Sequence, residues 1–143
     1  MGNLVIFYSK NKDILKIVSK YKEMYNASVY EIQTKNNISF FDKLSSTYLG
    51  SKISIKRCNL NLIEYDNVIL ISPLWFNKIP NPVIRFLEQS TGKIKNINYI
   101  LYNDNKKDYP CEFNKMDKIL NLRRDKSYFV KVNKDDLHVR VYQ

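Results

Sequence analysis

The sequence has 143 residues, of which 44% are hydrophobic, and a formal net charge of +10. This length predicts a single domain (residues 1–143) whose core is large enough to fold without a metal or disulfide bonds. No apolar run approaches the roughly 18–20 residues of a membrane-spanning helix, and residues 4–8 are too short for a secretory signal, so we expect a cytoplasmic protein without membrane association.

Strand and helix patterns alternate through the first half of the chain. Apolar runs and helical spacing predict, in order, a buried strand, a helix, an edge strand and a short helix: Asn3–Tyr8, Asp13–Tyr25, Ala27–Ile32 and Phe40–Leu49. Ser39 is expected to cap the short helix and Gly50 to end it. The next segment, Lys52–Glu64, fits neither a helical nor a strand period.

The alternation continues in the second half. The patterns predict, in order, a strand, a helix, a strand, a helix and a strand: Asn67–Ser72, Asn81–Gln89, Asn98–Tyr102, Phe113–Leu122 and Lys126–Val132. His138–Tyr142 alternates as well, and is either an extra edge strand or a tail. Such alternation is typical of an α/β fold in which a parallel sheet lies between helices.

The most informative stretch is residues 66–87. The unbroken apolar run Val68–Ile71 is typical of a strand buried on both faces, and it ends at Ser72-Pro73. The bulky pair Trp75-Phe76 follows, and a turn at residues 80–82 opens an amphipathic helix. Because ligands of parallel sheets bind beyond the carboxyl ends of the strands, we expect this aromatic loop to border a flat ligand.

Three stretches resemble the flavodoxin-like family, in particular its short bacterial members. They are NLVIFYSKNKDILKIV (3–18), YEI (30–32) with EYDNVIL (64–70), and SPLWFNKIPNPVIRFLEQ (72–89). The likeness covers about residues 3–105. It implies a three-layer sandwich around a five-stranded parallel sheet of order 2-1-3-4-5. It also implies a site for flavin mononucleotide (FMN) at the ends of strands 1, 3 and 4.

The phosphate loop departs from the family pattern. The matching residues are Ser9, Lys10, Asn11, Lys12, Asp13 and Ile14. Lys12 replaces a glycine and Ile14 a threonine, and two lost donors at ~1.5–3 kcal/mol each weaken binding by roughly 10²–10⁴-fold. Lys10 and Lys12 could restore part of this loss as point charges, whereas Asp13 opposes it. The alternative is an ordinary surface turn whose phosphate function has decayed.

Two further loops are expected to contact the flavin ring. They comprise Pro73, Leu74, Trp75, Phe76 and Asn77 after one strand, and Tyr102, Asn103, Asp104 and Asn105 after the next. Trp75, Phe76 and Tyr102 offer stacking surfaces, and Asn77 suits a position with positive φ. Asn103 and Asn105 could bind the pyrimidine edge, and Asp104 would disfavour an anionic reduced flavin. The alternatives are that Trp75 and Phe76 pack over the sheet edge or contact a protein, and that residues 102–105 form a solvated turn.

The net charge, the two cysteines and the single histidine restrict the partners and metals that the sequence predicts. The lysines are scattered, so compositional drift is the first interpretation of the +10 charge, an acidic protein or nucleotide partner the second, and nucleic-acid binding the least favoured. Cys58 and Cys111 lie far apart, and His138 is the only histidine. Since a structural metal site needs about four ligands, we predict free thiols, a surface histidine and no metal.

These observations lead to two main hypotheses. The first is a small FMN-binding redox protein, either an electron carrier or a minimal flavin reductase. We expect it to be a monomer or weak homodimer that binds a redox partner protein, and the positive charge is compatible with an acidic partner. The second is an interaction module that has lost its flavin and uses Trp75 and Phe76 to contact a protein. A nucleotide-binding or response-regulator variant lacks the required GxxxxGK[ST] motif or acidic pair.

Overall fold

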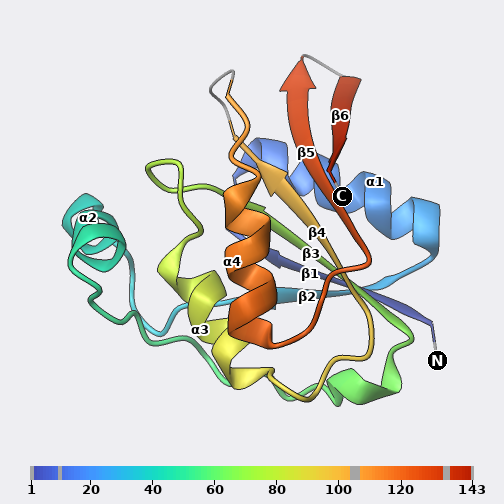
Figure 1. Ribbon diagram of the computed structural model, residues 1–143, viewed down its shortest axis with the longest axis horizontal. Helices are drawn as coiled ribbons and strands as arrows, with labels where there is room; N and C mark the ends of the chain where they lie inside the picture. Colours follow the sequence, from blue (N-terminus) through green and yellow to red (C-terminus); the bar gives the residue numbers. More distant parts are fainter. Residues whose placement is uncertain (1, 10, 104–106, 134–135, 143) are drawn as a thin grey trace.

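The computed structural model describes residues 2–9, 11–103, 107–133 and 136–142 (Figure 1). One sheet has the strand order β2-β1-β3-β4-β5-β6. Its strands are β1 (Asn3–Tyr8), β2 (Ser28–Ile32), β3 (Asn67–Pro73), β4 (Ile97–Tyr102), β5 (Lys126–Asn133) and β6 (Asp136–Tyr142). The first five strands are parallel, which confirms the predicted order, and β6 adds an antiparallel sixth strand beside β5. The predicted count of five was therefore one strand short.

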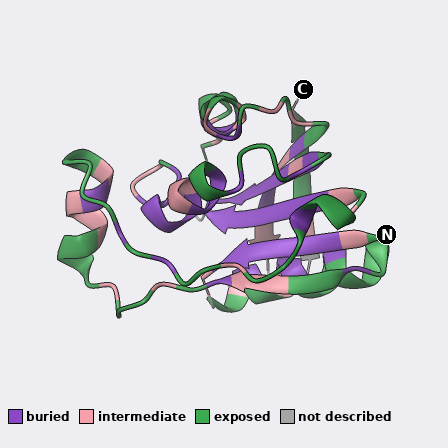
Figure 2. Ribbon diagram, turned by 90° about the horizontal axis from the view of Figure 1, so that it is seen from below, coloured by how far each residue is buried: buried purple, intermediate pink, exposed green. Residues whose placement is uncertain are grey.

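Helices cover both faces of the sheet, so the predicted three-layer arrangement is confirmed. They are α1 (Lys12–Tyr25), α2 (Phe40–Tyr48), α3 (Asn81–Gln89) and α4 (Cys111–Leu120). One core cluster joins α1 to the sheet, and the other joins α3 and α4 to the opposite face. Figure 2 shows the buried strands between these layers.

The central strands form because their side chains are apolar on both faces. Along β1, Leu4 and Ile6 enter the cluster beneath α3 and α4, whereas Val5 and Phe7 enter the cluster beneath α1. Successive side chains of a strand point to opposite faces, so a continuous apolar run is what a doubly covered strand requires. Each such side chain contributes roughly 1.5–3 kcal/mol on burial.

The ambiguous segment Lys52–Glu64 is mostly irregular. Ile55 forms an isolated antiparallel bridge with Thr34, and a short 3₁₀ helix, η1, spans Leu62–Glu64. Ile53, Ile55 and Leu62 are buried in the same cluster as α3. This segment therefore fills part of the core surface beside α3, although it contains no long regular element.

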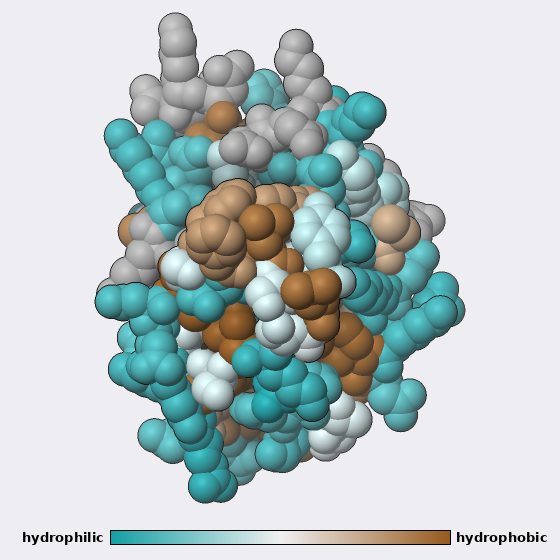
Figure 3. Space-filling model, turned by 90° about the vertical axis from the view of Figure 1, so that its left-hand side faces the viewer, coloured by the Kyte–Doolittle hydropathy of each residue, from teal (hydrophilic) through white to brown (hydrophobic). Residues whose placement is uncertain are grey.

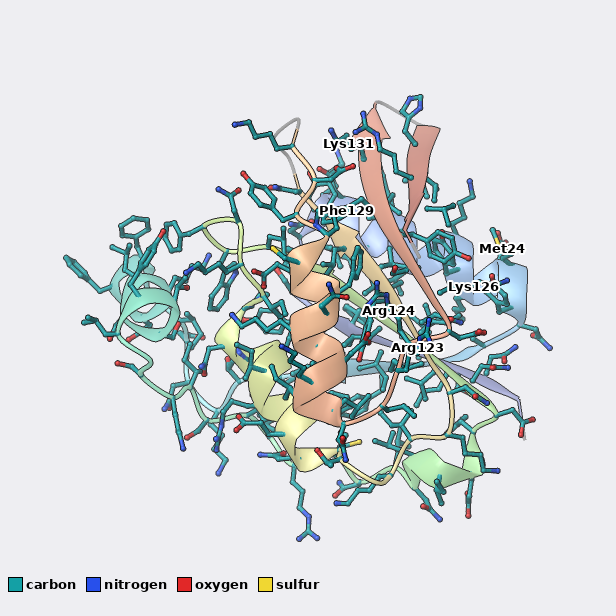
Figure 4. All side chains as sticks on the ribbon, in the orientation of Figure 1. Met24, Arg123, Arg124, Lys126, Phe129 and Lys131 are labelled. Atoms are coloured by element: carbon teal, nitrogen blue, oxygen red, sulfur yellow. The ribbon has the colours of Figure 1, made fainter. Side chains whose placement is uncertain are left out.

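Contacts of Arg124 stabilise the turn between α4 and β5, and Figure 4 shows this residue between the two elements. Its guanidinium lies 2.7 Å from the Asp117 carboxylate, donates to the Ser127 hydroxyl at 2.9 Å and lies 5.4 Å from the centroid of the Phe113 ring. Further along the chain, His138 is exposed on β6, as predicted. Cys58 and Cys111 are free thiols.

Candidate functional site

The carboxyl ends of three neighbouring strands lie at the same end of the sheet. β3 pairs in parallel with β1 on one side and with β4 on the other, so the loops that follow Tyr8, Pro73 and Tyr102 lie next to one another. The backbone N–H of Leu74 donates to the carbonyl of Tyr102 at 3.1 Å, which links two of these loops directly. The predicted convergence of the loops is confirmed. Lys10, Asp104 and Asn105 lie outside the described residues.

The first loop turns at Ser9 and enters α1. Ser9 has a φ of 78°, in the left-handed region that an L-residue seldom adopts. The Asn11 side-chain oxygen accepts the Ile14 N–H at 2.8 Å, so Asn11 is the N-cap of the helix. Lys12 is exposed, and the Ile14 side chain is buried in the core. The loop thus presents a helix N-terminus with its partial positive charge at the sheet edge.

A hydrogen bond across the loops joins Asp13 to Tyr102. The Tyr102 hydroxyl donates to the Asp13 carboxylate at 2.5 Å. The two residues are 89 positions apart, so the sequence offered no signal for this contact. This bond holds the Asp13 carboxylate, the only acidic group in the described part of the first loop, against the end of β4. The Tyr102 ring packs into the core cluster on the α1 side, and its predicted role in stacking stays a prediction.

The second loop contains a tight turn at residues 75–78. The backbone N–H of Trp75 donates to the Lys78 carbonyl at 2.8 Å, and the Lys78 N–H donates back at 2.9 Å. Both central residues have positive φ, 50° for Phe76 and 66° for Asn77, as a type I′ turn requires. The predicted positive φ of Asn77 is confirmed. The positive φ of Phe76 was not predicted and is uncommon for a bulky aromatic residue.

The Trp75 ring is buried in the core cluster on the α3 and α4 side of the sheet. It is 8% exposed, meets the Tyr8 ring edge-on at 5.7 Å between centroids, and has the Lys43 ammonium 5.3 Å from its centroid. Burial raises the pKa of Tyr8 to about 12. This position agrees with the alternative in which Trp75 packs over the sheet edge, and its stacking on a flavin stays a prediction.

The Phe76 ring is half-buried against α2. Its centroid lies 5.8 Å from that of the Phe40 ring and 5.7 Å from that of the Tyr48 ring. Sequence reasoning did not connect α2 with the site, although the aromatic residues at positions 40, 41 and 48 were visible. Only the tertiary structure brings that helix to the 75–78 turn.

Asn103 connects the second and third loops. It is buried, and its side-chain amide is 3.4 Å from the Asn77 side-chain oxygen and 3.4 Å from the Lys107 carbonyl. Both contacts are long, which leaves the amide weakly held. The structure places Asn103 beside Asn77, and its predicted contact with a pyrimidine edge stays a prediction.

Two surface hollows lie away from these loops. One, of about 930 Å³, lies between the segment around residues 55–63 and α3, and the other, of about 840 Å³, lies beside Arg123 and Arg124 at the turn before β5. Within the described ranges, no three acidic, cysteine or histidine residues gather as a metal site would need. No helix among those residues is long and apolar enough to cross a bilayer.

No protein-family model matches the sequence, and no curated protein matches it either. Several solved structures do match. A protein of Bacteroides eggerthii, named provisionally as a flavoprotein, has a TM-score of 0.75 at 17% identity over 90% of this chain and 87% of its own. A flavoprotein of Lactobacillus acidophilus in complex with FMN has a TM-score of 0.73 at 13% identity, covering 91% of each chain. The apo-form of the flavoprotein from Lactobacillus acidophilus has a TM-score of 0.71 at 12% identity, over 94% of this chain and 93% of its own.

At these identities the likeness shows a shared fold. The parallel strands in the order 2-1-3-4-5, with helices on both faces, form the flavodoxin-like arrangement, and the ligand-binding edge of that arrangement is where the strand order reverses. The strands at that point in this chain are β1 and β3, whose loops carry Ser9 and the 75–78 turn.

Proposed function

We propose that this protein binds FMN at the carboxyl ends of β1, β3 and β4 and serves as a small redox protein, either an electron carrier or a minimal flavin reductase. The observation that carries the proposal is the meeting of the three loops at the strand-order reversal of a flavodoxin-like sheet. The fold shared with a flavoprotein that was crystallised with FMN supports it.

The first loop has the chemistry that a phosphate group needs. The N-terminus of the 14-residue helix α1 is a preformed anion site, and Lys12 adds a full positive charge there. Asp13 would oppose an anion, but its carboxylate is engaged by the Tyr102 hydroxyl. Ser9 and Asn11 would supply polar side-chain donors. The donor set therefore fits a phosphate even though the glycine of the family pattern is absent.

The second and third loops would hold the ring. Phe76 and Asn77 are half-buried at the tip of the 75–78 turn, and Asn103 lies behind Asn77. Because both residues have positive φ, the type I′ turn places their peptide groups at the tip of the loop, where a bound ring would meet them. When bound, the flavin supplies reversible electron transfer, and the protein orients it and sets its surroundings.

A flavin titration of the purified full chain tests the proposal. We expect flavin absorbance or saturable quenching of added FMN fluorescence. Lys12→Glu should weaken binding by ~10-fold or more, because it replaces a cation at the phosphate position with an anion. The matched control is Lys20→Glu, an equal charge change at an exposed position further along α1. A colourless protein that leaves FMN fluorescence unchanged at high micromolar concentration would overturn the proposal and favour an interaction module without flavin.

A further inference from the structure

α2 carries apolar side chains that the core does not use. Phe40, Phe41, Leu44 and Tyr48 fall within an arc of ~100° at 3.6 residues per turn, yet the only buried residue of this nine-residue helix is Ser46. Phe41 is 78% exposed and Leu49, the C-cap, is 81% exposed. Figure 3 shows apolar side chains gathered on the face of the molecule that α2 occupies.

This surface is held in place by defined contacts. The Ser39 hydroxyl accepts the Asp42 N–H at 3.2 Å, and the Asp42 carboxylate accepts the Ser39 N–H at 2.9 Å, which forms a capping box. Within the apolar arc itself, the Phe40 and Tyr48 rings lie 5.8 Å and 5.7 Å from the Phe76 ring, centroid to centroid. Aromatic side chains fixed before binding lose less conformational entropy on association, so the surface is preorganised for a partner.

Two ammonium groups lie at the aromatic cluster. The Lys43 ammonium is 5.3 Å from the centroid of the Trp75 ring, and the Lys78 ammonium is 5.4 Å from that of the Tyr48 ring. Among the described residues neither lysine forms an ion pair. The surrounding segment, residues 33–63, contains five basic residues (Lys35, Lys43, Lys52, Lys56 and Arg57) but one acidic residue, Asp42. An apolar surface flanked by unpaired cations is complementary to an apolar surface flanked by carboxylates.

We infer that the α2 face, defined as Phe40, Phe41, Tyr48 and Leu49 with Lys43 and Lys78, is the docking surface for an acidic protein partner. Exposed aromatic side chains of this kind supply the anchors of protein interfaces. A second copy of this chain would bring the same lysines and another +10 charge to the contact, which opposes self-association through this face. The inference does not depend on flavin binding. Nevertheless, a partner on α2 would be one aromatic contact away from the 75–78 turn.

A displayed library of random peptides of about 12 residues, selected on the immobilised full chain, is the first test. We expect enriched peptides to combine Asp or Glu with apolar residues. The affinity of the synthetic top sequence is then measured by fluorescence anisotropy, and it should fall by about ten-fold between ~20 and ~200 mM NaCl because exposed charges are screened. Selection with and without FMN separates this inference from the proposed function.

Paired variants locate the contact. We expect Phe41→Ser with Leu49→Ser, and separately Lys43→Glu with Lys78→Glu, to weaken peptide binding by at least ~10-fold. The matched charge control is Lys20→Glu with Lys118→Glu, exposed on α1 and α4. The matched apolar control is Leu15→Ser with Met24→Ser, both on α1, where Figure 4 shows Met24 far from α2. Both controls should change affinity by less than ~2-fold. Circular dichroism checks that each variant is folded.

Several results would overturn the inference. One is the absence of enriched acidic peptides, and another is equal loss of binding in the control variants. A concentration-dependent mass in sedimentation that disappears in Phe41→Ser with Leu49→Ser would assign the face to a second copy of the chain. Pelleting with phosphatidylglycerol vesicles that disappears in the same variant would assign it to anionic lipid.

Discussion

The helices α1 and α2 have similar sequence patterns and opposite environments. Each follows a strand and begins with a side-chain N-cap, Asn11 for α1 and Ser39 for α2. α1 buries its apolar residues Ile14, Ile17, Val18 and Tyr21 against the sheet, whereas α2 exposes Phe40, Phe41 and Tyr48. An amphipathic pattern therefore predicts a helix and its apolar face, but not what that face will contact.

The difference arises from what already covers the sheet. α1 lies alone on its face and packs directly on β1 and β3. On the other face, α3, α4 and the buried residues Ile53, Ile55 and Leu62 complete the core cluster. α2 is left to touch α3 and the 75–78 turn, and it stands at the left of the molecule past the end of β2 (Figure 1). A helix forms through interactions within a few residues, whereas all the elements compete for the limited area of the sheet.

The largest expected effect is at the buried face of α1. Ile17 is fully buried, so Ile17→Ala should lower the free energy of unfolding by ~2–5 kcal/mol through lost burial and a residual cavity. Urea denaturation followed by circular dichroism measures the change. Ile17→Val, which removes one methylene, should cost only ~0.5–1.5 kcal/mol. Equal stability of Ile17→Ala and wild type would show that α1 is not packed as described.

Alkaline pH should also destabilise the α1 side of the core. Burial, with the neighbouring Tyr25 and Tyr128, raises the pKa of Tyr21 to about 12 from its ordinary 10.0. Because this folded-state pKa is raised, the stabilisation is fully present below pH 10 and is lost as the pH rises through about 12. Two pKa units correspond to roughly 2–3 kcal/mol.

Unfolding free energies of wild type and Tyr21→Phe, measured between pH 9 and pH 12, test this expectation. The lysines, whose ordinary pKa is about 10.4, titrate in the same range in both proteins, so the difference between the two profiles reports on Tyr21. Tyr21→Phe keeps the ring and removes the titrating group, so its stability should fall less steeply than that of wild type. Tyr8 and Tyr30, whose pKa values are also raised to about 12, leave a residual slope in the variant. Identical pH profiles for the two proteins would contradict the assignment to Tyr21.

A smaller effect is expected at the N-terminus of α2. Ser39→Ala removes one half of the capping box and should weaken the helix by ~0.5–2 kcal/mol. Because α2 contributes little to the core, the loss should appear as faster amide hydrogen exchange in the first turn of α2 rather than in global unfolding. Ser39→Asn retains a capping side chain and should exchange nearly as slowly as wild type.

The smallest effect on stability is expected at Phe41 of α2. Phe41→Ser removes a large apolar side chain from α2, yet it should change the free energy of unfolding by no more than ~0.5 kcal/mol because the ring is already exposed to solvent. The same urea assay used for Ile17 gives the value. A loss of several kcal/mol would mean that Phe41 is covered by part of this protein in solution.

Much of the fold was predictable because it rests on local patterns. The apolar run Asn3–Tyr8 and the spacing in Asn81–Gln89 match β1 and α3 residue for residue, and Ser39 caps α2 as expected. The last helix begins two residues earlier than predicted, at Cys111, and ends two earlier, at Leu120. The sixth strand was left open because alternation in a short terminal segment suits an edge strand and a tail equally.

The candidate site was predictable in place but not in detail. Parallel strand ends share an edge, so the three loops could be grouped from their order in the chain. The bond between Asp13 and Tyr102 and the burial of the Trp75 ring beneath Lys43 depend on contacts between segments distant in sequence. No pattern within one segment contains that information.

The amino-acid sequence by itself determined the strands, the helices and their faces, because hydrophobic periodicity and capping act within a few residues. The tertiary structure alone decided which apolar face becomes core and which becomes surface. That outcome follows from competition for a limited area of sheet, in which α1, α3 and α4 were buried and the aromatic residues of α2 remained in contact with water.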